Sequence, residues 1–288
     1  MSIRVRTLLP FSLLALVIGC DTEDSVSMTQ DAGGTTDVPE ATTKAAVETY
    51  ARIVHASYSD SLAAATDLDT EITAFVTTPS EQGLEDARDA WLASREPYLQ
   101  TEVYRFYEGP IDNEEDGPEG LMNAWPLDEA YIDYVEGDDD SGIVNDPSIT
   151  IDADALVALN EQAGETSIAT GYHAIEFLLW GQDMDPDGPG DRPYTDYVDG
   201  EGGTAENADR RAEYLTTVSS LLLLHLDELV AAWAPDATPA NYRSEFESVA
   251  PKEALRRILT GMIVLSGFET GGERLQTALD SGLQEDEH

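Results

Sequence analysis

The regular spacing of apolar side chains constrains this chain more than any other feature of its sequence. Over residues 205–233, leucine, valine and aromatic residues return every three or four positions and form one apolar stripe. Residues 46–75 and 251–279 show the same helical period. No stretch shows the sustained alternation of apolar and polar residues that a half-buried β-strand requires. The sequence therefore predicts an all-α fold built from antiparallel helical bundles.

Two further helices are predicted between these segments. The first covers about residues 80–107 and should be kinked or divided at Pro97, because proline disrupts the interior of a helix. The second covers about residues 164–180 and ends at Gly181. Residues 108–150 carry repeated Gly, Pro and Asp turn signals around one short helix, LDEAYIDYV.

The N-terminus is predicted to be a targeting segment. Arg4 and Arg6 precede the apolar run LLPFSLLALVIG, which is too short to span a bilayer. Gly19 stands directly before Cys20, as in a bacterial lipobox, and Cys20 is the only cysteine, so it has no disulfide partner within the chain. We therefore expect a lipoprotein signal peptide over residues 1–19 and a lipid anchor on Cys20. An ordinary signal peptide with a coincidental cysteine is the alternative.

Composition separates an acidic tether from a folded domain. Residues 20–42 are polar and almost free of large apolar side chains, so we expect a flexible acidic tether there and a helical domain over residues 43–288. The formal net charge of the chain is -43, which makes a nucleic-acid partner unexpected. The expected partner is a membrane, reached through the lipid, with the domain facing the periplasm of a bacterial envelope. The sequence does not distinguish the inner from the outer membrane.

The stretch GYHAIEFLLWGQD, residues 171–183, carries the main candidate for a functional site. His173 and Glu176 are three positions apart, so they share one face of a helix in an otherwise apolar run. Burying such groups is unfavourable unless a metal, an ion-pair partner or a catalytic role compensates. A histidine nitrogen with a carboxylate suits iron, zinc or manganese, although di-iron bundles use the order Glu-x-x-His. A simple ion pair remains open.

The residues around this motif resemble the imelysin family, which includes imelysin-like and iron-regulated protein A-like envelope proteins of bacteria. The family signature is Gly-x-His-x-x-Glu, here Gly171, His173 and Glu176. The resemblance extends over about residues 45–288. Four further segments match it in order, residues 53–62, 91–112, 123–135 and 266–275.

The resemblance implies helical bundles, a site around the motif and a role in bacterial iron uptake or iron regulation. Iron is the implied cofactor, with zinc or calcium as alternatives, and an envelope iron-transport component is the implied partner. Some members of the family carry a metallopeptidase label. By position, the implied metal-site residues are His173, Glu176, Glu102, Asp112 and His55, with Gly171, Arg105, Glu269 and Arg274 in support.

The chain departs from the resemblance at its last residues. It stops at LQEDEH, residues 283–288, where iron-regulated members continue with a longer motif and more helix. We therefore expect the C-terminal part of the family fold to be missing. Glu285, Asp286 and His288 would then begin a ligand-bearing segment.

Three functions remain in competition at this point. The first is a lipid-anchored protein that binds a metal ion or metal complex, and the second is a metallopeptidase. Zinc hydrolases commonly use two histidines one helical turn apart, and this chain has 4 histidines with no clear second zinc ligand. We therefore favour binding over catalysis. The third is an envelope scaffold in which His173 and Glu176 only hold helices together.

Two other patterns have simpler explanations. The loop DMDPDG, residues 183–188, matches the first half of an EF-hand, but Tyr194 stands where a calcium loop has glutamate. We expect an acidic surface loop. A further group of aromatic residues has the spacing of core packing, although it would also suit a cofactor site: Trp91, Tyr98, Tyr104 and Tyr107.

Overall fold

The computed structural model describes residues 38–184 and 188–282. The predicted signal peptide, Cys20 and most of the tether lie outside these residues, as do Glu285, Asp286 and His288. Within the described ranges the chain forms helices and no strand, with one isolated bridge between Val135 and Asp138. The all-α prediction is confirmed.

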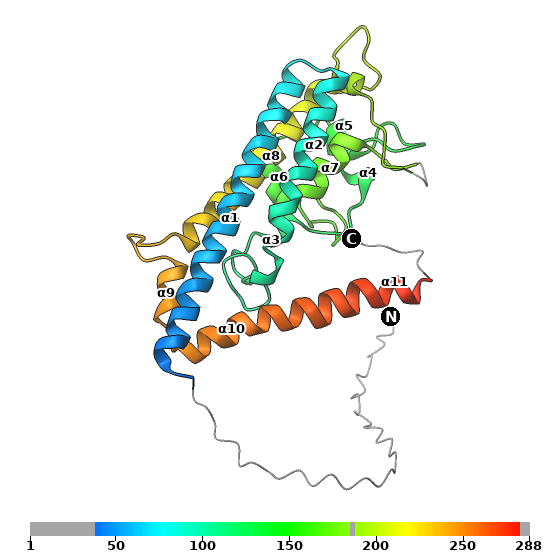
Figure 1. The fold of residues 1–288 in the computed structure, drawn as a ribbon. Helices are drawn as coiled ribbons and strands as arrows, with labels where there is room; N and C mark the ends of the chain where they lie inside the picture. Colours follow the sequence, from blue (N-terminus) through cyan, green and yellow to red (C-terminus); the bar gives the residue numbers. More distant parts are fainter. Residues whose placement is uncertain (1–37, 185–187, 283–288) are drawn as a thin grey trace, which may run out of the picture. The chain divides into compact units, whose positions relative to one another are not determined.

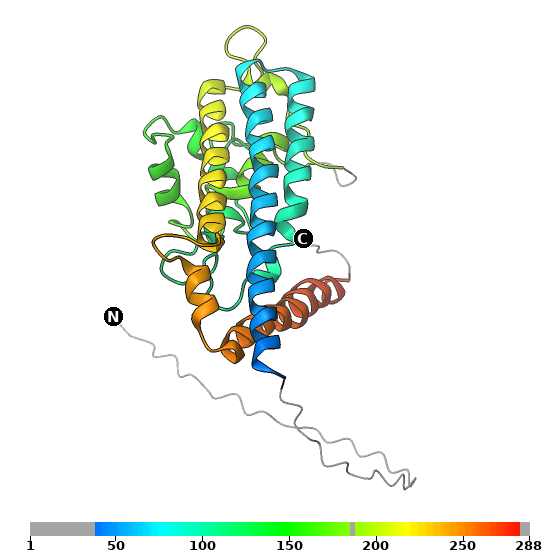
Figure 2. The ribbon, with the colours of Figure 1, turned by 60° about the vertical axis from the view of Figure 1, so that its left-hand side comes forward.

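Four helices build the core of the region that the structure describes. They are α1 (Glu40–Thr77), α2 (Glu81–Leu99), α7 (Gly171–Trp180) and α8 (Ala208–Trp233). Helix α1 packs along both α2 and α8, while α7 packs on α8 and α2 (Figure 1, Figure 2).

The contacts along α1 show that α8 runs antiparallel to it. Ser219 in the first half of α8 donates to Asp69 in the second half of α1, whereas Trp233 at the end of α8 contacts Tyr50 in the first half of α1. Their facing sides are apolar and fully buried, as at Leu68 and Leu226. Helix α8 is long and apolar enough to cross a membrane by length and composition, as a core helix of a folded domain also is.

Shorter helices fill the connections between these long ones. They are η1 (Glu102–Tyr104), α3 (Glu119–Met122), α4 (Glu129–Ile132), α5 (Gly142–Asn145), α6 (Ala153–Leu159), η2 (Tyr194–Tyr197) and α9 (Tyr242–Ser248).

The last helical stretch is continuous and contains a π-helical middle. It consists of α10 (Pro251–Val264), η3 (Leu265–Gln276) and α11 (Thr277–Asp280). Pro251 occupies the first turn, as predicted, where its missing N–H leaves no helical bond unmade. Several large apolar side chains of this stretch are exposed: Leu259, Met262, Ile263, Phe268, Leu275 and Leu279.

Two predicted helices were too long. The helix expected over 80–107 ends at Leu99, and Phe106 and Glu108 have positive φ angles of 72° and 58°, which a right-handed helix cannot contain. The helix expected over 164–180 begins only at Gly171, whose φ is +85°. In both places, residues that the apolar spacing assigned to a helix form irregular backbone instead.

Other boundaries also differ from the predictions. Helix α1 starts at Glu40, inside the segment predicted as tether. The short helix expected at 127–135 covers only Glu129–Ile132, because Asp133 turns into extended backbone. Helix α6 was not predicted, and its N-terminus is capped by Asp152, whose carboxylate accepts from the N–H of Ala155.

Candidate functional site

The N-terminus of α7 is held against α3 at Gly171. A Cβ at this position would lie 2.5 Å from the carbonyl oxygen of Met122, and the positive φ also disfavours a side chain. The hydroxyl of the preceding residue, Thr170, donates to the carbonyl of Leu121 at 2.9 Å. Glycine is therefore required where α7 meets α3, which explains its place before the histidine motif.

The C-terminal end of α7 is fixed by side chains from two other elements. The guanidinium of Arg88 on α2 donates to the carbonyl of Leu179 at 3.0 Å and to that of Arg192 at 3.0 Å. The hydroxyl of Tyr197 donates to the carbonyl of Leu178 at 2.7 Å. The bonds to Leu178 and Leu179 satisfy carbonyls that a helix end leaves without partners, so both ends of α7 are anchored.

A buried ionic cluster supports the loop that follows α7. Asp133 accepts from Arg192 at 2.8 Å and from Arg211 of α8 at 2.6 Å, and all three side chains are almost completely buried. Burial alone would raise the pKa of Asp133, but the two guanidinium groups and the N–H of Tyr134 outweigh it and lower that pKa. Asp196 also accepts from Arg192, at 3.3 Å.

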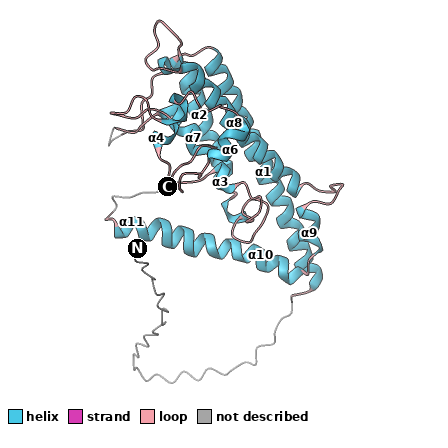
Figure 3. Ribbon diagram, turned by 180° about the vertical axis from the view of Figure 1, so that it is seen from behind, coloured by secondary structure: helices cyan, strands magenta, loops and turns pink. Residues whose placement is uncertain are grey.

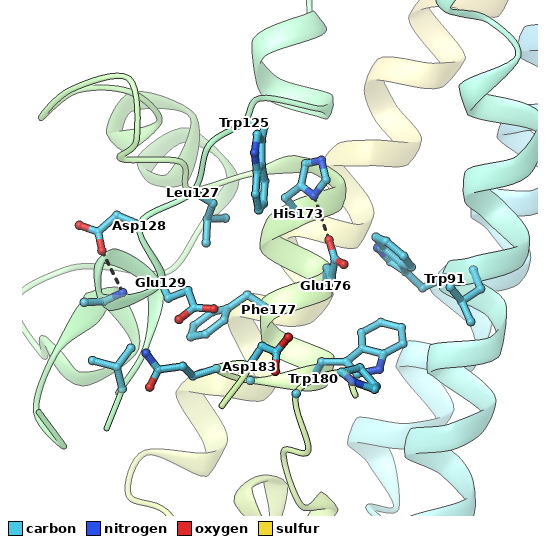
Figure 4. Close-up of a pocket in the computed structure, with 17 residues that line it drawn as sticks. Trp91, Trp125, Leu127, Asp128, Glu129, His173, Glu176, Phe177, Trp180 and Asp183 are labelled. Carbon is cyan, nitrogen blue, oxygen red and sulfur yellow. Dashed lines mark hydrogen bonds and ion pairs between the residues drawn. The ribbon is translucent and has the colours of Figure 1, made fainter. Parts of the chain in front are cut away.

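His173 and Glu176 meet as the helical spacing predicts. Nδ1 of His173 lies 2.9 Å from Oε2 of Glu176, with side-chain exposures of 15% and 40%. The imidazole also packs against Trp125, with ring centroids 4.8 Å apart. The pair therefore stands at a partly open surface, where the carboxylate orients the ring (Figure 4).

This pair lines a cavity of about 710 Å³. Trp91 and Leu92 of α2 line it, together with the segment from Trp125 to Ala130 that includes α4, the exposed face of α7, and residues on both sides of 185–187. Four aromatic and four acidic residues line it: Trp91, Trp125, Phe177 and Trp180, and Asp128, Glu129, Glu176 and Asp183. The carboxylate of Asp128 turns away and accepts from the N–H of Ala130 at 3.2 Å (Figure 4).

The pKa of Glu129, on the wall of this cavity, lies above its ordinary value. Partial burial raises its pKa, although hydrogen bonds from the side chain of Gln182 and the backbone of Asp183 act in the opposite direction. Its carboxylate consequently takes up a proton more readily than an exposed glutamate does.

The other predicted acidic ligands have partners of their own. Glu102 of η1 forms an ion pair with Arg274 of η3. Asp112 accepts hydrogen bonds from the backbone N–H groups of Phe106 and Gly109. Arg105 pairs with Glu119 at 3.0 Å. These contacts hold together the irregular segment between α2 and α3, and neither Glu102 nor Asp112 lines the cavity.

His55 and Glu269 also lie elsewhere. His55 is half-buried on α1, where burial and the nearby Arg243 lower its pKa. Glu269 is half-buried on η3. Neither lines the cavity, so of the predicted metal ligands that the structure describes, only His173 and Glu176 come together. Among residues 38–184 and 188–282, no three His, Cys, Asp or Glu side chains are grouped closely enough to hold one metal ion.

Sequence reasoning missed most of the cavity wall. Trp125 and Glu129 lie within the family-like segment at 123–135, and Trp180 and Asp183 lie within the quoted motif, so both stretches carried the signal. The aromatic group at 91–107 is core, as expected, because its rings are at most 8% exposed. Trp91 nevertheless also borders the cavity.

Comparisons with known proteins identify the family of this chain. The family model Imelysin matches residues 54–288. An iron-regulated protein A from Synechococcus elongatus is 38% identical over 77 residues, which cover 27% of this chain and 20% of that protein.

A solved structure shares the fold. The crystal structure of a protein designated an iron-regulated protein A precursor, from Parabacteroides distasonis, superposes with a TM-score of 0.51 at 23% identity. The match covers 81% of this chain and 54% of that one. The chain thus spans only part of the length of these relatives. Because the family model matches most of the chain, including the Gly-x-His-x-x-Glu motif, this protein belongs to the imelysin family.

Proposed function

We propose that this protein serves bacterial iron uptake or iron regulation by binding iron at the cavity beside His173 and Glu176. Its relatives from Synechococcus elongatus and Parabacteroides distasonis are named for iron regulation. The observation that carries the proposal is that the two motif side chains meet at 2.9 Å on the wall of a cavity.

The size of the cavity favours an iron complex over a bare ion. About 710 Å³ is within the range of pockets that hold small organic ligands, far more than one ion occupies. A complex brings most of its own ligands, so a single histidine and carboxylate would be enough protein contact. The proposed cargo is therefore an iron ion already held by an organic chelator.

The pair has a suitable arrangement for this role. With Nδ1 of His173 directed to Glu176, Nε2 is the ring nitrogen left to coordinate iron. A carboxylate bonded to the second nitrogen of a metal-binding histidine orients the ring and increases its basicity. Gly171 and the anchored ends of α7 keep this geometry rigid.

The proposed setting is the bacterial envelope. Lipidation at Cys20 would attach the protein to a membrane facing the periplasm, where an iron-transport component is the proposed partner. The supporting observation is the sequence of residues 1–20 alone. Mass spectrometry of the membrane fraction would detect the lipid, and a Cys20→Ser variant should move to the soluble fraction.

Iron affinity tests the site directly. We expect neutral ferric chelates, such as the tris(acetohydroxamate) complex, to bind the parent protein, and His173→Ala and Glu176→Gln to weaken binding by at least about tenfold. His225→Ala is the matched control, because His225 on α8 makes the same i,i+3 contact with Glu228, at 3.2 Å, outside the cavity lining. Thermal unfolding of each variant checks the fold.

The competing functions predict different results. Equal iron affinity in all variants, with lower stability after loss of His173, would identify the pair as structural. Preferential binding of zinc over iron would instead favour the metallopeptidase alternative.

A further inference from the structure

The cavity combines aromatic walls with an excess of negative charge. Trp91 and Trp180 pack edge to face with centroids 5.3 Å apart, and Trp125 stands opposite with 47% of its surface exposed (Figure 4). The face of an indole ring carries negative electrostatic potential and attracts cations. These rings would therefore bind a cation in addition to apolar groups.

Among the described residues that line the cavity, acidic side chains outnumber basic ones. Asp128, Glu129, Glu176 and Asp183 line it, while none of the described lining residues is lysine or arginine. His173 is the one basic side chain among the described lining residues, and its Nδ1 is already directed to Glu176. An anionic ligand would be repelled and a cationic ligand attracted.

Two arginines stand near the cavity without lining it. Arg88 stacks on Trp180 at 5.5 Å, but its donors go to the carbonyls of Leu179 and Arg192. Arg95 stacks on Trp91 and Tyr172 and donates to Asn123. Neither arginine lines the cavity; the charge of Arg95 attracts Glu176, but one such charge does not offset four lining acidic residues.

The size and ligand set of the cavity indicate an organic cation. A monatomic cation needs several converging ligands, and the described residues contain no group of three. An organic ammonium group needs only aromatic faces and a nearby carboxylate, and its apolar substituents would fill a space of about 710 Å³.

We propose that this cavity recognises organic cations, with a quaternary or alkylated ammonium group held between the indoles of Trp125 and Trp91 and the carboxylates of Glu129 and Glu176. This proposal rests on the proposed function in taking the cavity as the ligand site, and it specifies the organic part of the ligand. An iron complex bound here would carry amine or ammonium groups. Recognition of the ammonium itself requires no metal.

A charged ligand and its neutral isostere give the sharpest test. Choline and 3,3-dimethylbutan-1-ol differ by a charged nitrogen in place of a carbon, so they present nearly equal apolar surfaces. Binding to the full chain would be followed by calorimetry and tryptophan fluorescence, with a chelator present to remove metals. We expect choline to bind at least about tenfold more tightly than the isostere, since an indole face attracts a desolvated cation and gives a neutral group no such attraction.

Variants locate the binding site within the cavity. Trp125→Ala and Glu129→Gln should each weaken choline binding about threefold to thirtyfold, with little effect on the isostere in the second case. Glu228→Gln, on an exposed side chain outside the cavity lining, should change nothing. Because Trp125 is half-exposed, its removal should leave the fold intact, and thermal unfolding would check this.

The outcomes separate this proposal from the iron proposal. Equal affinity for choline and its isostere, or no binding of either, would overturn recognition of organic cations. Ferric chelates that contain no amine would be titrated separately. If the parent binds them and His173→Ala does not, the iron proposal stands even though recognition of organic cations has failed. Conversely, choline binding with no iron affinity would sustain this inference and reject the iron proposal.

Discussion

Two regions of the molecule carry the same apolar period: the bundle of α1, α2, α7 and α8, and the final helical stretch, residues 251–280. They differ in how far their apolar side chains are buried. In the bundle, Leu222 and Leu226 of α8 are at most 1% exposed. In the final stretch, Ile263, Leu275 and Leu279 are 60% to 66% exposed. Figure 3 shows the two regions from behind.

Apolar periodicity therefore identifies the apolar face of a helix, but it does not predict which element covers that face. Helix α8 is covered by α1 on one side and by α7 on another. The final stretch contacts α1, α9 and η1 mainly through its first half, and Arg274 reaches Glu102 farther along. The same pattern thus supplies core in one region and exposed surface in the other.

The largest expected effect is in the ionic cluster beside the bundle. Asp133→Asn removes the charge that faces Arg192 and Arg211, leaving two almost completely buried guanidinium groups with too little compensation. We expect the free energy of unfolding to fall by about 3 to 5 kcal/mol, measured by urea denaturation. Asp139→Asn, on an exposed loop, is the control and should change little.

Lowering the pH should reduce the difference in stability between the parent and Asp133→Asn. The pKa of folded Asp133 lies below its ordinary value, so this carboxylate stabilises the fold above the unfolded pKa, and its contribution is lost as pH falls through the folded pKa. The stability gap between the parent and Asp133→Asn should therefore narrow below about pH 4. A gap that stays constant down to pH 2 would mean that charge is not the cause.

Matched leucine truncations test the comparison itself. Leu222→Ala leaves a cavity in the bundle and should lower the free energy of unfolding by about 2 to 5 kcal/mol. Leu279→Ala, on the final stretch, should change it by less than about 0.5 kcal/mol. Similar losses at both positions would show that something covers residue 279 in solution, which repeating the measurement over protein concentration would detect.

Two glycines of the final stretch separate its packed half from its open half. A Cβ at Gly261 would lie 2.5 Å from the carbonyl oxygen of Val103, whereas one at Gly267 would meet nothing within 4 Å. Gly261→Ala should destabilise by about 1 to 3 kcal/mol, because backbone must move. Gly267→Ala should stabilise by about 0.5 to 1 kcal/mol through lower unfolded-state entropy. Thermal unfolding gives both signs.

The smallest effect concerns the contact between η3 and η1. Glu102 and Arg274 are partly exposed, at 15% and 29%, so solvent weakens their attraction. A double-mutant cycle with Glu102→Gln and Arg274→Met should give a coupling energy of about 0.2 to 1 kcal/mol. A coupling near zero would mean that the distal half of the final stretch is not held by this pair.

The helical period was enough to predict most long elements, but the irregular segments could not be read from it. Helix α2 stops at Leu99 and α7 starts at Gly171, since positive φ angles and close backbone contacts act only at single residues. The i,i+3 contact of His173 with Glu176 was predictable because helix geometry alone produces it. The contact of Glu102 with Arg274 joins residues far apart in sequence and was not.

By itself the sequence determined the helical class, the antiparallel bundle and the pairing of His173 with Glu176, because these follow from periods of three and four residues. Tertiary structure decided which apolar faces are buried, and it brought Trp91, Trp125 and Glu129 around that pair. It also assigned Glu102 and Asp112 to partners of their own. Such contacts depend on how distant helices pack, and local spacing carries no information about that packing.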